Sequence, residues 1–119
     1  MEQEQIQSTA FEIILHSGSS RTMIHEAFKM MKDSEFRGAE EKLEEANEAL
    51  LLAHKSQTSL LQQYSSGENI NMEIIMVHAQ DHLMTTMTLR EVALEMLTLY
   101  ENWKRSVRRR EGGFSYEQR

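Results

Sequence analysis

The sequence has no cysteine and no proline, and only five of its 119 residues are glycine. A chain without cysteine forms no disulfide, no thiolate metal site and no cysteine nucleophile. The rarity of helix breakers, together with abundant Glu, Ala, Leu, Met, Lys and Gln, favours helices. No segment shows the alternating β-branched pattern of a strand. We therefore expect an all-α protein.

Three further features are missing from the sequence. Its apolar runs span only a few residues, far short of the roughly 20 needed for a membrane-spanning helix. The N-terminal segment MEQEQIQSTA is acidic and polar, unlike a secretory signal. The net charge of −6 argues against general nucleic-acid binding. These absences predict a cytoplasmic protein that neither inserts into a membrane nor binds nucleic acid.

Two polar segments, KDSE and SSGEN, divide the chain into three long helices, expected at about residues 6–32, 35–65 and 70–109. Asp33 or Ser34 can cap the second of these helices. Three long helices with apolar stripes predict a helical bundle.

The length suits one domain with a modest core. We assign residues 1–105 to the three-helix domain and residues 106–119 to a basic helix end with a frayed tail, with Gly112 and Gly113 ending the helix. Gly18 interrupts the first helix at a cost of about 1 kcal/mol relative to alanine. It marks either a kink or a close approach of another helix.

The second helix has the most regular apolar pattern, with spacings that alternate between three and four. This single stripe is Phe36, Ala39, Leu43, Ala46, Leu50, Ala53, Gln57, Leu60 and Tyr64. The third helix carries two neighbouring stripes and is apolar nearly all round in its first half. One is Ile70, Ile74, Val77, Asp81, Met84 and Thr88, and the other is Ile75, His78, His82, Thr85, Leu89, Val92, Met96, Leu99 and Trp103. Because two other helices cover only part of such a surface, the protein is expected to oligomerise.

Asp81 lies between Val77 and Met84 in an otherwise apolar stripe, which suggests burial. A lone buried carboxylate is costly unless it is paired, protonated or bound to metal. Arg21 and Arg90 are the nearest candidate partners in type. If copies of Asp81 face one another across an oligomer axis, a hard cation such as Mg²⁺ can neutralise them. The alternative is a half-exposed carboxylate on the rim of the stripe.

His78 and His82 are one helical turn apart and share a face. They are compatible with ordinary structural histidines, with a zinc-binding pair, or with a nucleophile that carries a phosphoryl group. The sequence reads HAQDH and lacks the glutamate of HExxH, which disfavours a hydrolytic zinc enzyme.

The cluster KRSVRRR near the C-terminus places cations where they complement a helix dipole. A solvated helix end is favoured for it over a phosphoprotein-docking role for Arg105, Arg108, Arg109 and Arg110.

The run VHAQDHLMTT resembles the signature of the lactose/cellobiose class of enzyme IIA in the bacterial sugar phosphotransferase system. The segments IILHSGSSR, AHKSQTSLLQ and SGEN match that family in order and spacing, so the resemblance covers nearly the whole chain. It is nearer to the cellobiose or diacetylchitobiose branch than to the lactose branch.

The resemblance implies an antiparallel three-helix bundle that assembles as a homotrimer, and a phosphotransferase activity. His78 would accept a phosphoryl group from the histidine-containing phosphocarrier protein and pass it to enzyme IIB, for uptake of a disaccharide. Gln80 would hydrogen-bond the phosphoryl oxygens, His82 could line the same cleft, and Asp81 would meet its symmetry mates around a divalent metal, Mg²⁺ by its chemistry. The competing hypothesis is a non-catalytic oligomer or metal-binding scaffold that uses His78, Asp81 and His82.

Overall fold

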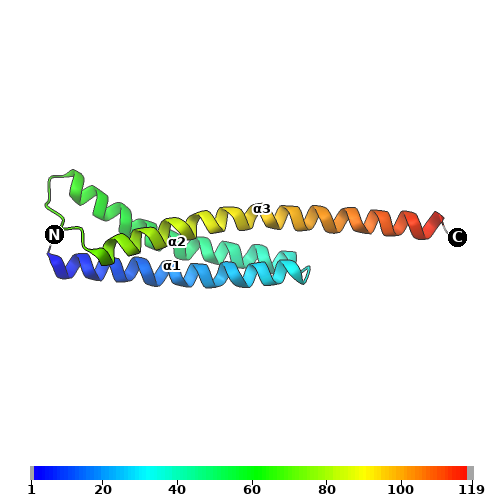
Figure 1. The fold of residues 1–119 in the computed structure, drawn as a ribbon, viewed down its shortest axis with the longest axis horizontal. Coiled ribbons are helices and arrows are strands. Elements are labelled where there is room, and N and C mark those ends of the chain that lie inside the picture. The colour runs from blue at the N-terminus through cyan, green and yellow to red at the C-terminus, as the bar shows by residue number, and fades with distance from the viewer. Residues whose placement is uncertain (1, 118–119) are drawn as a thin grey trace.

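The computed structural model describes the backbone of residues 2–117 and the side chains of residues 2–111. It contains three helices, α1 (Gln3–Lys32), α2 (Phe36–Ser65) and α3 (Ile74–Glu117), and the described residues form no strand. α1 and α2 form an antiparallel pair, and α3 runs back along both of them (Figure 1). The molecule is elongated, 76 × 21 × 20 Å, because α3 continues well past the turn that joins α1 to α2. The expected all-α antiparallel three-helix bundle is confirmed.

The turn between α1 and α2 is tight and uses its amides to close α1. The amides of Asp33 and Ser34 bond to carbonyls in the last turn of α1, and Glu35 N donates to Met30 O at 2.8 Å. Ser34 has a φ of 61°, and the N-cap of α2 is Glu35, without a side-chain capping bond. The prediction that Asp33 or Ser34 caps α2 is therefore wrong, because these residues terminate the preceding helix.

α3 differs from its predicted bounds at both ends. It begins at Ile74 rather than residue 70, with the amides of Met76 and Val77 bonding to Glu73 O, and the chain before it turns at Gly67 (φ 97°). It continues to Glu117 rather than ending near residue 109. Glycine inside a helix costs only about 1 kcal/mol, so two glycines without a proline do not end it.

The segment after Gly112 and Gly113, expected to fray, is instead helical as far as Glu117. The last two residues, 118–119, lie outside the described part of the chain.

The core consists of two apolar clusters along the bundle. The cluster nearer the N-terminus is Ile6, Ala10, Ile13, Leu50, Ala53, Leu60, Met76, Ala79 and Leu83. The other, nearer the α1–α2 turn, is Ile24, Ala27, Met31, Ala39, Leu43, Ala46, Ala93 and Leu97. The predicted stripe of α2 is buried along most of its length, although Tyr64 at its end is 67% exposed. Alanines in that stripe leave room for the close packing of α1 against α2.

The buried face of α3 is neither of its two predicted stripes. It follows Met76, Ala79, Leu83, Thr86, Ala93 and Leu97. The first predicted stripe lies on the opposite side of the helix, where Ile74 is 88%, Val77 54% and Met84 49% exposed. α3 therefore packs inside its own chain on one face and presents an apolar stripe on the other. No helix in the described residues is both long enough and apolar enough to cross a bilayer.

Candidate functional site

His78 is the fifth residue of α3 and its side chain is exposed. The ring of His82 lies one turn further along, nearly parallel to it, with 6.1 Å between ring centroids and 4° between the planes. The predicted pairing of the two imidazoles on one helix face is confirmed. His78 is therefore presented to solvent beside a second, more buried imidazole.

His82 is half-buried because it lies against α1. Its Nε2 is 3.7 Å from the position that a Cβ would occupy on Gly18, which is ordinary van der Waals contact. α1 is continuous through this residue, so Gly18 marks a close approach rather than a break in the helix. Burial lowers the pKa of His82 below its usual value of 6.5, Arg21 and His78 add to this, and Asp81 opposes it. His82 is therefore mainly neutral at pH 7.

Arg21 links α1 to α3 directly beside these histidines. Its guanidinium donates to Thr86 Oγ1 from Nε at 3.0 Å and from one terminal nitrogen at 2.8 Å, and that same nitrogen reaches Thr85 Oγ1 at 2.7 Å. Thr86 Oγ1 in turn donates to the His82 carbonyl at 2.7 Å. Sequence reasoning treated Arg21 only as a possible partner of Asp81. Its spacing of three residues from Gly18, which places both on one face of α1, was the signal available.

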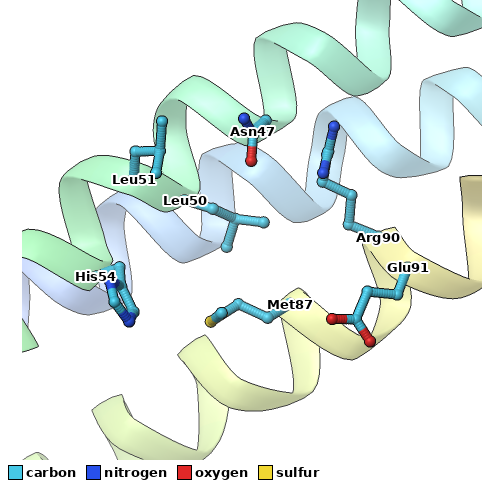
Figure 2. Close-up of a pocket in the computed structure, with 7 residues that line it drawn as sticks. All are labelled: Asn47, Leu50, Leu51, His54, Met87, Arg90 and Glu91. Atoms are coloured by element: carbon cyan, nitrogen blue, oxygen red, sulfur yellow. The ribbon is translucent and has the colours of Figure 1, made fainter.

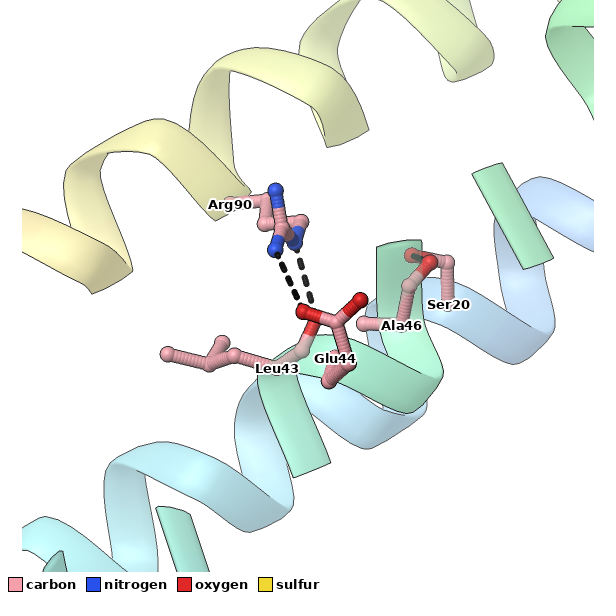
Figure 3. Close-up of polar contacts among 5 residues, drawn as sticks. All are labelled: Ser20, Leu43, Glu44, Ala46 and Arg90. Atoms are coloured by element: carbon pink, nitrogen blue, oxygen red, sulfur yellow. Dashed lines mark hydrogen bonds and ion pairs between the residues drawn. The ribbon is translucent and has the colours of Figure 1, made fainter. Parts of the chain in front are cut away.

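Asp81 is exposed within the single chain and lies on the outward stripe between Val77 and Met84. Neither arginine proposed as its partner reaches it. Arg21 is held by the two threonines. Arg90 Nε donates to Leu43 O at 2.8 Å, and Arg90 Nη2 lies 3.9 Å from Glu44 Oε2 (Figure 3). In the described part of the chain no group of three or more His, Asp or Glu side chains could hold a metal ion.

The contacts in Figure 3 join the three helices to one another. Ser20 Oγ on α1 donates to Ala46 O on α2 at 2.8 Å, and Arg90 joins α3 to the same helix. In both bonds the acceptor is a carbonyl oxygen inside a helix, which can accept a second hydrogen bond besides its helical one. The bonds therefore fix the positions of the three helices relative to one another without breaking helical hydrogen bonds.

Gln80 is turned toward α2. Gln57 Nε2 donates to its Oε1, and its own amide nitrogen lies 3.6 Å from Met76 Sδ. Within one chain the side-chain amide of Gln80 is therefore occupied by its contacts with Gln57 and Met76. A hydrogen bond from Gln80 to a phosphoryl group on His78 stays a prediction.

A separate cavity of about 270 Å³ opens between α2 and α3 (Figure 2). Its lining is Asn47, Leu50, Leu51, His54, Met87, Arg90 and Glu91. Met87 is two and a half helical turns after His78, so the cavity lies on the opposite side of α3 from the exposed imidazole. The exposed imidazole of His78 therefore faces away from this cavity.

Comparison with known proteins gives one family. Residues 8–101 match the family described as the lactose/cellobiose-specific IIA subunit of the PTS system. The lactose-specific EIIA component of Staphylococcus epidermidis is 45% identical over 101 residues, covering 85% of this chain and 97% of that protein.

Solved structures agree with this assignment. The crystal structure of PtcA from S. mutans has a TM-score of 0.84 and 62% identity, covering 85% of this chain and 99% of the other. A chain of the IIA(Chitobiose)–HPr complex of the N,N'-diacetylchitobiose branch of the Escherichia coli phosphotransferase system has a TM-score of 0.72. It is 30% identical and the match covers 87% of this chain and 99% of that chain. The chain belongs to the lactose/cellobiose-specific IIA subunits of the PTS system, and is a phosphotransferase component.

Proposed function

We propose that this chain is a cytoplasmic phosphoryl carrier, phosphorylated on His78. The histidine-containing phosphocarrier protein would be its donor and enzyme IIB its acceptor, in the uptake of a disaccharide of the cellobiose, diacetylchitobiose or lactose type. The observation that supports it best is the exposure of His78 within the family segment VHAQDHLMTT. An HPr complex of a relative of the same fold is consistent with this donor.

The chemistry requires an unprotonated imidazole nitrogen and access for two successive proteins. A ring nitrogen of His78 forms a bond to phosphorus while the nitrogen–phosphorus bond of the donor breaks, leaving its electron pair on the donor ring. In the second step a thiolate of enzyme IIB takes the phosphoryl group and the electron pair returns to His78. In such transfers most of the rate acceleration comes from alignment of the donor and acceptor atoms and from electrostatic stabilisation of the phosphoryl group.

The surroundings of His78 suit an anionic phosphoryl group. Arg21 keeps a guanidinium at Thr85, which lies seven residues after His78 and so on the same side of α3. His82, held neutral by burial, remains able to donate one N–H hydrogen bond from this face. We assign Arg21 an electrostatic role toward the phosphoryl group and His82 a place in the lining of the same cleft.

The exposed stripe of α3 is the surface on which we propose that three copies assemble. Ile74, Val77 and Met84 are too exposed and too apolar for a helix face in contact only with water. Asp81 lies in the middle of this stripe, and three copies around an axis would bring three carboxylates together. Carboxylate oxygens are the donors that Mg²⁺ prefers, so the residue fits a divalent cation, whose part would be to neutralise the facing charges.

The proposal is tested by incubating the protein with phosphoenolpyruvate, enzyme I and the phosphocarrier protein, then measuring its intact mass. The wild type and a His54→Ala control, which changes another exposed histidine, should each gain one acid-labile phosphate. His78→Ala should gain none. Phosphate on His78→Ala, or none on the wild type, would refute the assignment.

A further inference from the structure

The part of α3 that lies beyond the family segment carries a charge cluster that phosphoryl transfer at His78 does not use. The family match ends at residue 101, and five of the chain's 13 Lys and Arg residues fall within residues 104–110. Lys104 is 26 residues after His78 on the same helix, about 39 Å away at 1.5 Å per residue. The cluster is therefore remote from the phosphorylation site.

Three of these cations converge on the turn between α1 and α2. Lys104, Arg105 and Arg108 line a cavity of about 200 Å³ together with Ser34, Phe36 and Glu101. Lys104 and Arg108 are one helical turn apart, and Arg105 is adjacent on the same side, so the three face the turn together. Arg109 and Arg110 do not line the cavity.

Within residues 2–111, whose side chains the structure describes, these cations outnumber the acidic groups of the cavity they line. Among the described side chains, none of the ion pairs or hydrogen bonds involves Lys104, Arg105 or Arg108. Glu101 is the single acidic residue of the lining, so three cations against one carboxylate leave two positive charges in excess.

The helix dipole does not account for the cluster. The stabilising effect of cations falls off within the last turn of a helix. α3 continues to Glu117, so Arg105 is twelve residues, about three turns, from the helix end. The prediction that the cluster merely caps a helix end near residue 109 is therefore wrong for Lys104 and Arg105, and their placement needs another explanation.

We propose that this cavity binds a phosphate group through Lys104, Arg105 and Arg108. A cavity of this size accepts a compact group, and guanidinium and ammonium donors arranged around it match phosphate oxygens. The phosphate can belong to a small soluble ester or to a lipid headgroup, because both present the same oxygens. This site is independent of the carrier role of His78.

The test is calorimetric titration of the full-length protein with inorganic pyrophosphate at low ionic strength. The double variant Arg105→Gln/Arg108→Gln should bind at least about tenfold more weakly, because it removes two charge-assisted contacts. The matched control Arg109→Gln/Arg110→Gln removes the same charge from the same helix without touching the lining. It should bind within about threefold of the wild type, the loss expected from diffuse charge alone.

Glu101→Gln tests the proposal in the opposite direction, because it removes the carboxylate that repels the bound anion and should raise the affinity. It should tighten binding by about threefold or more. A parallel assay with phosphatidylglycerol and with phosphatidylcholine vesicles identifies the source of the phosphate. Binding to the anionic vesicles that depends on Arg105 and Arg108 assigns a lipid headgroup, and pyrophosphate binding alone assigns a soluble ester.

Equal losses in the two double variants would show only diffuse attraction and overturn the site. Failure of the wild type to bind pyrophosphate or anionic vesicles at millimolar concentration would overturn it as well. Phosphorylation of His78 should be unchanged in both double variants, which separates this proposal from the carrier function.

Discussion

The imidazole of His82 on α3 lies against Gly18 on α1, with Nε2 at 3.7 Å from the place where a Cβ would stand. This contact joins the segments IILHSGSSR and VHAQDHLMTT through two residues that are 64 positions apart in the sequence, since 82 − 18 = 64. The absence of a side chain at Gly18 lets α1 approach the histidine face of α3 closely. Gly18 is therefore part of the site and does not interrupt the helix.

Gly18→Ala should be tolerated and should stabilise the protein by up to about 1 kcal/mol, because a Cβ at 3.7 Å is an ordinary contact and alanine is the better helix former. Gly18→Leu should displace His82 and destabilise the bundle. Urea unfolding at neutral pH measures both effects. Equal stabilities for the alanine and leucine variants would contradict the close contact.

Stability should fall as the pH is lowered through the range just below 6.5. Burial lowers the pKa of His82 in the folded chain, so the unfolded chain takes up the proton first. Since the unfolded state then binds more protons, the free energy of unfolding decreases with falling pH until the folded pKa is reached. Denaturant unfolding at about pH 7.5 and about pH 5.5 would measure this loss.

The control for this pH effect is His82→Gln, which cannot titrate. Its free energy of unfolding should depend less on pH over the same interval than that of the wild type. An unchanged pH dependence in this variant would assign the effect to other groups.

Arg21→Ala should lower stability by about 1–2 kcal/mol, since the hydroxyls of Thr85 and Thr86 lose a shared donor. Arg21→Lys should recover little of this, because an ammonium cannot reproduce the two-nitrogen contact with Thr86. The rate of phosphoryl transfer to His78, measured on folded variants, should also decrease. An Arg21→Ala rate equal to that of the wild type would remove Arg21 from the site.

Asp81→Leu should preserve or strengthen the proposed trimer in the absence of metal, because it replaces three facing charges with apolar contacts along Val77 and Met84. Sedimentation velocity in a chelator measures the oligomeric state. The wild type under the same conditions should melt at a lower temperature than with Mg²⁺. Dissociation of Asp81→Leu into monomers would count against the axial position of Asp81.

Much of the architecture follows from local sequence. The scarcity of breakers, the α2 stripe with its alternating spacings, and the polar segments KDSE and SSGEN determine three helices and the residues of α2 that are buried. The spacing of His78 and His82 places both imidazoles on one face of α3, because residues at i and i+4 share a face whatever surrounds the helix.

Tertiary structure alone decided which side of α3 is buried. A helix that is apolar nearly all round has no single face that periodicity can select, so the buried line through Met76, Ala79 and Leu83 emerged only from its packing against α1 and α2. The hydrogen bonds from Arg21 to Thr86 and from Gln57 to Gln80 likewise depend on how each of the three helices is oriented about its own axis. Helix formation is governed by neighbours in the sequence, whereas the orientation of each helix about its axis is set by side chains that meet across the bundle.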